Sequence, residues 1–191
     1  MLYELLVLAR LLYGPQHGYL IAKVASDMLG PWAKVSPGSL YPTLARLVGA
    51  GLIAEVGPAP ERHRDPRTYA ITGAGRVRFR ELMLDTASNP SDYQRRFHLK
   101  VPFLEFLASD ERQELFDHYG EHCRTAIRYL EKETRLLLQY APGSGVASPA
   151  GIDNAIALMA HQADQWRAEL AWVGRLRERI APSTASVPEA E

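Results

Sequence analysis

The spacing of three leucines constrains the fold of this chain more than any other feature. Leu40, Leu44 and Leu47 recur at intervals of four and three residues, before the helix terminator Gly51. This spacing places the three leucines on one face of a helix and indicates that this face is buried. The residues left on its outer faces are Tyr41, Thr43, Ala45 and Arg46.

The start of this helix has two alternatives. Ser36 followed by Pro37 is a favourable N-terminus, and Ser39 alone is another. A proline deep inside a helix loses a hydrogen bond and clashes with the preceding turn, whereas a proline in the first turn is tolerated. Pro42 lies in the first turn if Ser39 is the N-cap. Pro42 therefore favours that start without excluding the other.

The segments on either side of this helix predict the fold class of the N-terminal half. Residues 2–13 are apolar on nearly every side, and residues 18–30 have helical spacing. Residues 52–56 and 67–71 have the pattern of two hairpin strands, and Thr72 is a candidate N-cap for a further helix. Three helices followed by an arginine-bearing hairpin are the order of a winged helix-turn-helix.

The charge distribution and composition exclude several classes of protein. The chain has 22 basic and 22 acidic residues, so bulk positive charge does not drive binding to nucleic acid. Residues 1–85 nevertheless hold ten Lys/Arg against seven Asp/Glu, while residues 86–191 hold twelve against fifteen. The single cysteine, Cys123, excludes an intramolecular disulfide framework. No apolar run approaches the ~20 residues of a membrane span, and no secretory signal is visible, so we expect a cytoplasmic protein without a membrane partner.

The C-terminal half predicts a helix that packs lengthwise on another helix. Apolar residues recur every seven positions from residue 152 to residue 180, and a second apolar series lies between them. The two series are Ile152, Met159, Trp166, Val173 and Ile180, and Ile156, Ala163 and Leu170. The predicted fold class is therefore mainly α: a winged helix-turn-helix domain followed by an α-helical, coiled-coil-like dimerisation domain.

Composition and periodicity also predict the domain boundaries. Residues 1–87 form the winged helix-turn-helix domain, and residues 88–96 form a connector without periodicity. Residues 97–181 form the helical dimerisation and effector domain. The small, polar residues 182–191 are expected to form a disordered tail.

Three segments occur in an order and spacing typical of one protein family. They are GPQHGYLIAK at 14–23, WAKVSPGSLYPTLARLVGAGLI at 32–53 and RTYAITGAGR at 67–76. With them the chain resembles the PadR family of bacterial transcriptional regulators. The resemblance implies a homodimeric DNA-binding repressor, less often an activator, whose C-terminal helices dimerise. It also implies that a small aromatic effector releases the DNA in some members.

The candidate DNA contacts lie on the outward helix face, at the helix start and in the hairpin. Such a helix enters the major groove of double-stranded DNA, its N-terminal amides bind phosphate, and basic hairpin residues contact the backbone. A dimer then reads a palindromic operator as two half-sites. The candidate DNA-binding residues are Lys34, Ser36, Gly38, Ser39, Tyr41, Pro42, Thr43, Arg46, Arg62, His63, Arg64 and Arg67. The candidate dimerisation residues are Leu5, Leu8, Leu12, Ile152, Ile156, Met159, Trp166, Leu170 and Val173.

Two other functions compete with this interpretation. The predicted recognition helix holds a single basic residue, Arg46, so the alternative is a winged helix that docks proteins without sequence-specific DNA binding. A third function is suggested by HYGEH at 118–122, which matches the H-x-x-E-H spacing of some zinc proteases. Gly120 weakens such a site, and no third-ligand motif follows it. We therefore expect no catalytic residue, no metal and no cofactor.

Overall fold

The chain forms two compact units, one ending at Ala108 and the other beginning at Ser109. The structure is a computed structural model. It describes residues 2–29, 37–57, 67–139 and 148–180. The predicted tail at 182–191 lies outside the described residues.

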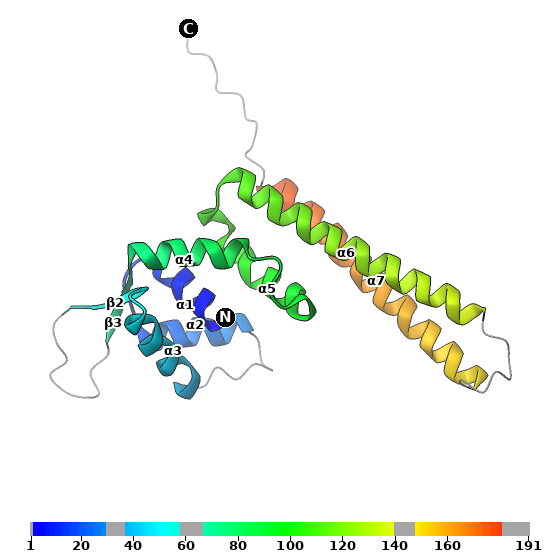
Figure 1. Cartoon of the computed structure of the whole chain (residues 1–191), viewed down its shortest axis with the longest axis horizontal. Helices are drawn as coiled ribbons and strands as arrows, with labels where there is room; N and C mark the ends of the chain where they lie inside the picture. Colours follow the sequence, from blue (N-terminus) through cyan, green and yellow to red (C-terminus); the bar gives the residue numbers. More distant parts are fainter. Residues whose placement is uncertain (1, 30–36, 58–66, 140–147, 181–191) are drawn as a thin grey trace, which may run out of the picture. The chain divides into compact units, whose positions relative to one another are not determined.

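The first unit is a winged helix-turn-helix, which confirms the predicted fold class (Figure 1). In its small antiparallel sheet β3 lies between β1 and β2, with Tyr69 opposite Gln16 on one side and Glu55 on the other. The sequence did not predict β1, because two residues beside a Gly-Pro breaker carry no periodicity. The elements are α1 (Leu2–Leu11), β1 (Gln16–His17), α2 (Gly18–Leu29), α3 (Pro37–Gly49), β2 (Ile53–Val56), β3 (Thr68–Ile71) and α4 (Gly73–Leu84).

Helix α1 is the central helix of this unit. Residues 5–9 are at most 5% exposed, and the helix contacts α2, α3 and α4. The apolar residues on all sides of α1 are therefore buried by the other helices of the first unit. Leu5 and Leu8 lie in this core, so the structure assigns them to packing and not to the dimer contact predicted for them. Leu12 is half-buried, and its dimer contact stays a prediction.

Helix α3 has the buried face that its leucines predict. Leu40, Leu44 and Leu47 are at most 1% exposed. The helix begins at Pro37, so Pro42 lies inside it and the alternative start at Ser39 is not the one adopted. Proline lacks an amide hydrogen, and one carbonyl of the preceding turn therefore loses its usual helical bond. Pro42 itself lies on the exposed face of the helix.

Thr72 caps helix α4, as the sequence predicts. Its hydroxyl oxygen accepts a hydrogen bond from the amide of Gly75 at 3.0 Å. The same hydroxyl donates a hydrogen bond to the backbone oxygen of Gly51 at 2.7 Å. This one side chain therefore ties the start of α4 to the turn that follows α3.

Residues 90–106 are helical and belong to the first unit, which differs from the predicted connector at 88–96 and the predicted boundary at 97. Tyr93 and Phe97 are at most 1% exposed and anchor this segment. Tyr93 and Phe97 lie one helical turn apart, which is the spacing of a buried helix face. The prolines before and after this segment hide that helical pattern in the sequence. The elements are η1 (Pro90–Asp92), α5 (Tyr93–Lys100) and η2 (Val101–Phe106).

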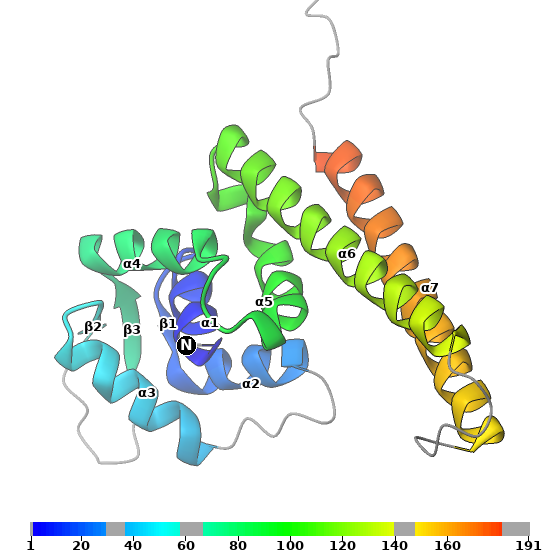
Figure 2. The ribbon, with the colours of Figure 1, turned by 45° about the vertical axis from the view of Figure 1, so that its right-hand side comes forward.

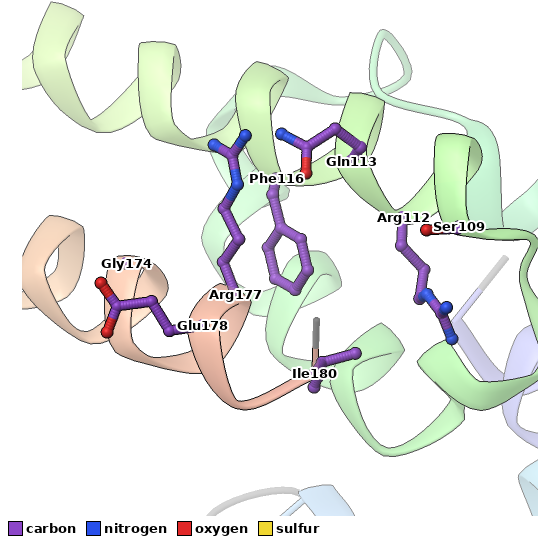
Figure 3. A pocket seen from close by; sticks show the side chains of 8 residues that line it. All are labelled: Ser109, Arg112, Gln113, Phe116, Gly174, Arg177, Glu178 and Ile180. Carbon is purple, nitrogen blue, oxygen red and sulfur yellow. The ribbon is translucent and has the colours of Figure 1, made fainter. Parts of the chain in front are cut away.

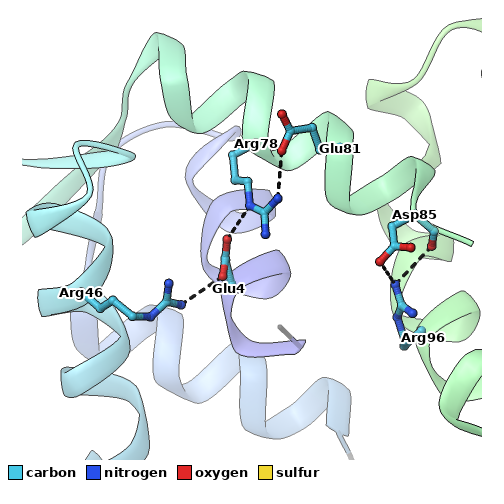
Figure 4. A network of polar contacts seen from close by, with 6 residues as sticks. All are labelled: Glu4, Arg46, Arg78, Glu81, Asp85 and Arg96. Carbon is cyan, nitrogen blue, oxygen red and sulfur yellow. Dashed lines mark hydrogen bonds and ion pairs between the residues drawn. The ribbon is translucent and has the colours of Figure 1, made fainter. Parts of the chain in front are cut away.

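A buried polar cluster joins the end of α4 to α5. Arg96 Nη2 donates to Asp85 Oδ2 at 2.6 Å (Figure 4). Lys100 Nζ donates to the backbone oxygen of Asp85 at 2.7 Å. Burial raises the pKa of Asp85, but hydrogen bonds from Ser88 and Arg96 outweigh it and lower the pKa to about 2. Burial and the neighbouring Arg96 charge lower the pKa of Lys100 to about 8. Both cations stabilise the negative end of the α4 dipole.

The second unit is an antiparallel pair of long helices, α6 (Ser109–Leu138) and α7 (Pro149–Ile180) (Figure 2). Its helices pack along their length, which confirms the helix pairing predicted from the heptads. Ala163 and Val173 are buried, and the hydroxyl of Tyr119 donates to Glu169 at 2.7 Å. The other predicted seam residues are half-buried: Ile152, Ile156, Met159, Trp166, Leu170 and Ile180. Their partner helix is α6 of the same chain, and dimerisation through them stays a prediction.

Candidate nucleic-acid interface

The exposed face of α3 is the candidate surface for DNA. Tyr41 is 52% exposed, and the side chain of Arg46 is 55% exposed. Pro42 and Ala45 lie exposed between these two flanks. The centre of the face is therefore made of small residues, and the larger polar side chains stand at its edges. Small residues let a helix backbone come close to base edges.

The predicted contacts at the helix start are described only in part. Gly38 and Ser39 lie in the first turn of α3, where backbone amides have no partner within the helix. Lys34 and Ser36 lie outside the described residues. Thr43, the remaining predicted contact on α3, is half-buried.

Helix α2 begins close to α3, and this extends the candidate surface. A Cβ atom on Gly18 would lie 3.2 Å from Leu44 and 3.6 Å from the ring of Tyr41. Tyr19, the next residue, is 71% exposed. Tyr19 was not among the predicted contacts, because the helical pattern alone does not show that its side chain stays uncovered.

The hairpin contributes one described cation to this region. Arg67 is exposed, and its Nη1 donates to Glu55 Oε1 at 2.8 Å across the hairpin. This pairing joins the arginine to the neighbouring strand while its side chain remains exposed. Three other predicted hairpin contacts, Arg62, His63 and Arg64, lie outside the described residues.

A charged network joins α3 to the core of the unit (Figure 4). Glu4 on α1 accepts hydrogen bonds from Arg46 Nη2 at 3.0 Å and from Arg78 Nε at 2.7 Å. Arg78 also donates to Glu81 at 2.8 Å. Burial raises the pKa of Glu4, but the bonds from Arg78 and Arg46 outweigh it and lower the pKa below its ordinary value. Glu4 is therefore a buried carboxylate ion, and sequence patterns gave no sign of it.

The residues of the H-x-x-E-H motif have other roles in the structure. The His122 ring stacks on Tyr119 and meets Trp166 edge-on, while Glu121 pairs with Arg124 at 2.9 Å. Burial raises the pKa of the Cys123 thiol to about 11, which keeps it protonated and unreactive. In the part of the chain that the structure describes, no group of three or more His, Cys, Asp or Glu side chains is placed to hold a metal ion.

A pocket of about 480 Å³ lies within the second unit (Figure 3). Phe116 and Arg112 point from α6 toward the end of α7, where Ile180 lines the pocket. Its volume falls within the range of about 300–1,000 Å³ found for small-molecule sites.

Among the described helices, none is long and apolar enough to cross a membrane.

These features define the class of the protein: a winged helix-turn-helix unit followed by a helical hairpin unit. Residues 6–81 match the transcriptional regulator PadR-like family. The first unit therefore contains a PadR-like domain, as its sequence motifs predict.

Relatives of known name are distant in sequence. The negative transcriptional regulator PadR of Bacillus subtilis (strain 168) is 22% identical over 143 residues, covering 75% of this chain and 79% of that protein. The crystal structure of Bacillus subtilis PadR in complex with operator DNA is 19% identical and covers 93% of this chain and 97% of that one, with a TM-score of 0.40. The complex of the same protein with p-coumaric acid is 20% identical and covers 91% of this chain and 99% of that one, with a TM-score of 0.39.

Proposed function

We propose that the protein is a cytoplasmic repressor that binds a palindromic operator as a homodimer, without catalysis. The family of residues 6–81 supports this proposal, as does the name of the 22% identical relative, a negative regulator. In each protomer, α3 lies in the major groove and the hairpin follows the adjacent backbone.

The two faces of α3 are the observation that carries the proposal. Leu40, Leu44 and Leu47 fix the helix to the core, so the opposite face is held outward as a rigid surface. Tyr41 and Arg46 flank this face and supply hydrogen-bond donors for base edges or phosphates. Ser39 and Gly38 place the first amides of the helix toward a phosphate.

The remaining proposed contacts add affinity without sequence preference. Arg62, His63, Arg64 and Arg67 come between β2 and β3 in the sequence, and Lys34 precedes α3. Each phosphate contact makes the binding constant fall as salt rises. A plot of the logarithm of the binding constant against the logarithm of the salt concentration steepens by about −0.9 per contact. One α3 helix reads too few base pairs for strong specificity, so a dimer with two half-sites about one turn apart is required.

A titration of duplex DNA at two salt concentrations tests the proposal. We expect nanomolar binding to a duplex selected from a random pool, weaker binding to unrelated duplexes, and a marked loss of affinity at the higher salt. Protein docking by the winged helix, the alternative function, predicts no enrichment of any duplex sequence. That result would replace the present proposal.

We further propose that a small aromatic carboxylate binds the pocket of the second unit and releases the DNA. The Phe116 ring supplies an aromatic wall, and the guanidinium of Arg112 suits a carboxylate. Calorimetry with p-coumaric acid as the probe tests this, with Arg112→Ala and the exposed Arg124→Ala as a matched pair. We expect binding to be lost only in Arg112→Ala; equal binding by both variants would place the ligand elsewhere.

A further inference from the structure

We propose that Glu4 is a positioning residue for DNA recognition, which holds the guanidinium of Arg46 in one orientation beside the exposed face of α3. This inference rests on the proposed function, because it concerns how α3 reads a base. Glu4 itself is 6% exposed and lies on α1, away from the exposed face. It therefore acts on DNA only through Arg46.

The geometry divides the Glu4 carboxylate between two helices (Figure 4). Oε1 accepts from Arg78 Nε at 2.7 Å, and Oε2 accepts from Arg46 Nη2 at 3.0 Å. Arg78 is held in turn by Glu81 on α4 at 2.8 Å. Because Arg78 fixes one oxygen, the other oxygen is presented to Arg46 in a defined direction.

Arg46 needs such support because of where it stands. Its side chain is 55% exposed, at the edge of the face whose centre is Pro42 and Ala45. A free arginine there samples many rotamers, and ordering it on a base loses conformational entropy. An arginine already held by a carboxylate has lost much of that freedom before DNA arrives.

The held guanidinium still has donors to offer. Glu4 uses Nη2, and among the described residues no partner is found for Nη1 or Nε of Arg46. Guanine presents O6 and N7 as acceptors in the major groove, and arginine is their usual donor.

The experiment measures base preference at each position of the selected half-site, together with thermal unfolding. The variants are Glu4→Gln, Arg46→Ala and the double variant. We expect Arg46→Ala to reduce discrimination at one base-pair position by about tenfold or more. Glu4→Gln should reduce discrimination at the same position, and the double variant should lose nothing further there, because both changes remove the same oriented donor.

Glu105→Gln is the matched control, since it removes the same charge from the first unit at an exposed carboxylate that bonds to Tyr13 and not to the Glu4 network. It should leave base preference unchanged. If Glu4→Gln instead weakens all duplexes alike, Glu4 is only a structural residue and the inference is wrong. A further loss in the double variant, beyond Arg46→Ala, would also overturn it.

Arg46→Lys keeps the proposal testable should Glu4→Gln not fold. Lysine retains the charge, but all its donors are on one rotating nitrogen, so a bond to Glu4 cannot hold a second donor nitrogen in a fixed direction as it does in the planar guanidinium. We expect it to lose discrimination at the same position as Arg46→Ala; unchanged discrimination would show that no held guanidinium is needed. If the unmodified protein enriches no duplex at all, the proposed function fails, and this inference fails with it.

Discussion

A Cβ atom placed on Gly75 would lie 2.0 Å from the backbone oxygen of Leu52. Helix α4 therefore packs directly on the turn between α3 and β2, and no residue with a side chain fits at this point. The same turn is bonded to Thr72, so the start of α4 and the end of α3 are fixed to each other twice. This contact helps to set the position of the proposed recognition helix.

Gly75→Ala should lower the free energy of unfolding by about 2–3 kcal/mol, because the backbone of Leu52 has to move to admit the methyl group. Gly73→Ala is the matched control, as nothing lies within 4 Å of a Cβ atom there. Urea unfolding of the two variants measures the difference. Equal stability of both would contradict the close packing of α4 on this turn.

Acid should remove a defined part of the stability through Asp85. Its pKa is lowered from 3.8 to about 2 in the folded protein, so the folded state favours the charged form. The contribution of about 2 kcal/mol is complete above the ordinary pKa and is lost as pH falls toward 2. Unfolding free energies between pH 5 and pH 2 should therefore fall less steeply in Asp85→Asn. Asp27→Asn, at an exposed position of α2, should retain the steep fall.

Dimerisation is expected through the seam of α7, and a pair of substitutions tests it. Met159 lies in the seam and is half-buried, whereas Ala157 is exposed on another face of the same helix. Met159→Glu should give a monomer in sedimentation at micromolar concentration, and Ala157→Glu should remain a dimer. Circular dichroism of both variants shows whether the helical hairpin is retained. A folded Met159→Glu dimer would place the interface elsewhere.

The sequence predicts the elements whose side chains repeat regularly. The leucines of α3 and the heptads of α7 are such repeats, and Thr72 is a local signal that needs no distant partner. The strand at Gln16–His17 was missed because it exists only through pairing with β3. The sequence placed Tyr93 in a connector and Phe97 in the second domain, because no local pattern shows that both are buried in the first unit.

The candidate site was predictable as a surface but not as a network. Helical spacing identifies Tyr41 and Arg46 as outward residues, and their exposure agrees with it. The bond from Arg46 to Glu4 joins residues 42 positions apart, and no periodicity connects them. Side-chain pairing across helices depends on the packed fold, so only the structure reveals it.

The most direct test of DNA binding by α3 places a negative charge at the centre of its exposed face. Ala45→Glu should weaken binding to the selected duplex by at least about tenfold, because the carboxylate would face the phosphates and base edges of the groove. Ala87→Glu, also exposed and in the same unit, carries the same charge change as a control and should bind as the unmodified protein does. Fluorescence anisotropy at one fixed salt concentration gives both affinities. Equal binding by the two variants would contradict the account, since α3 would then not lie against the DNA.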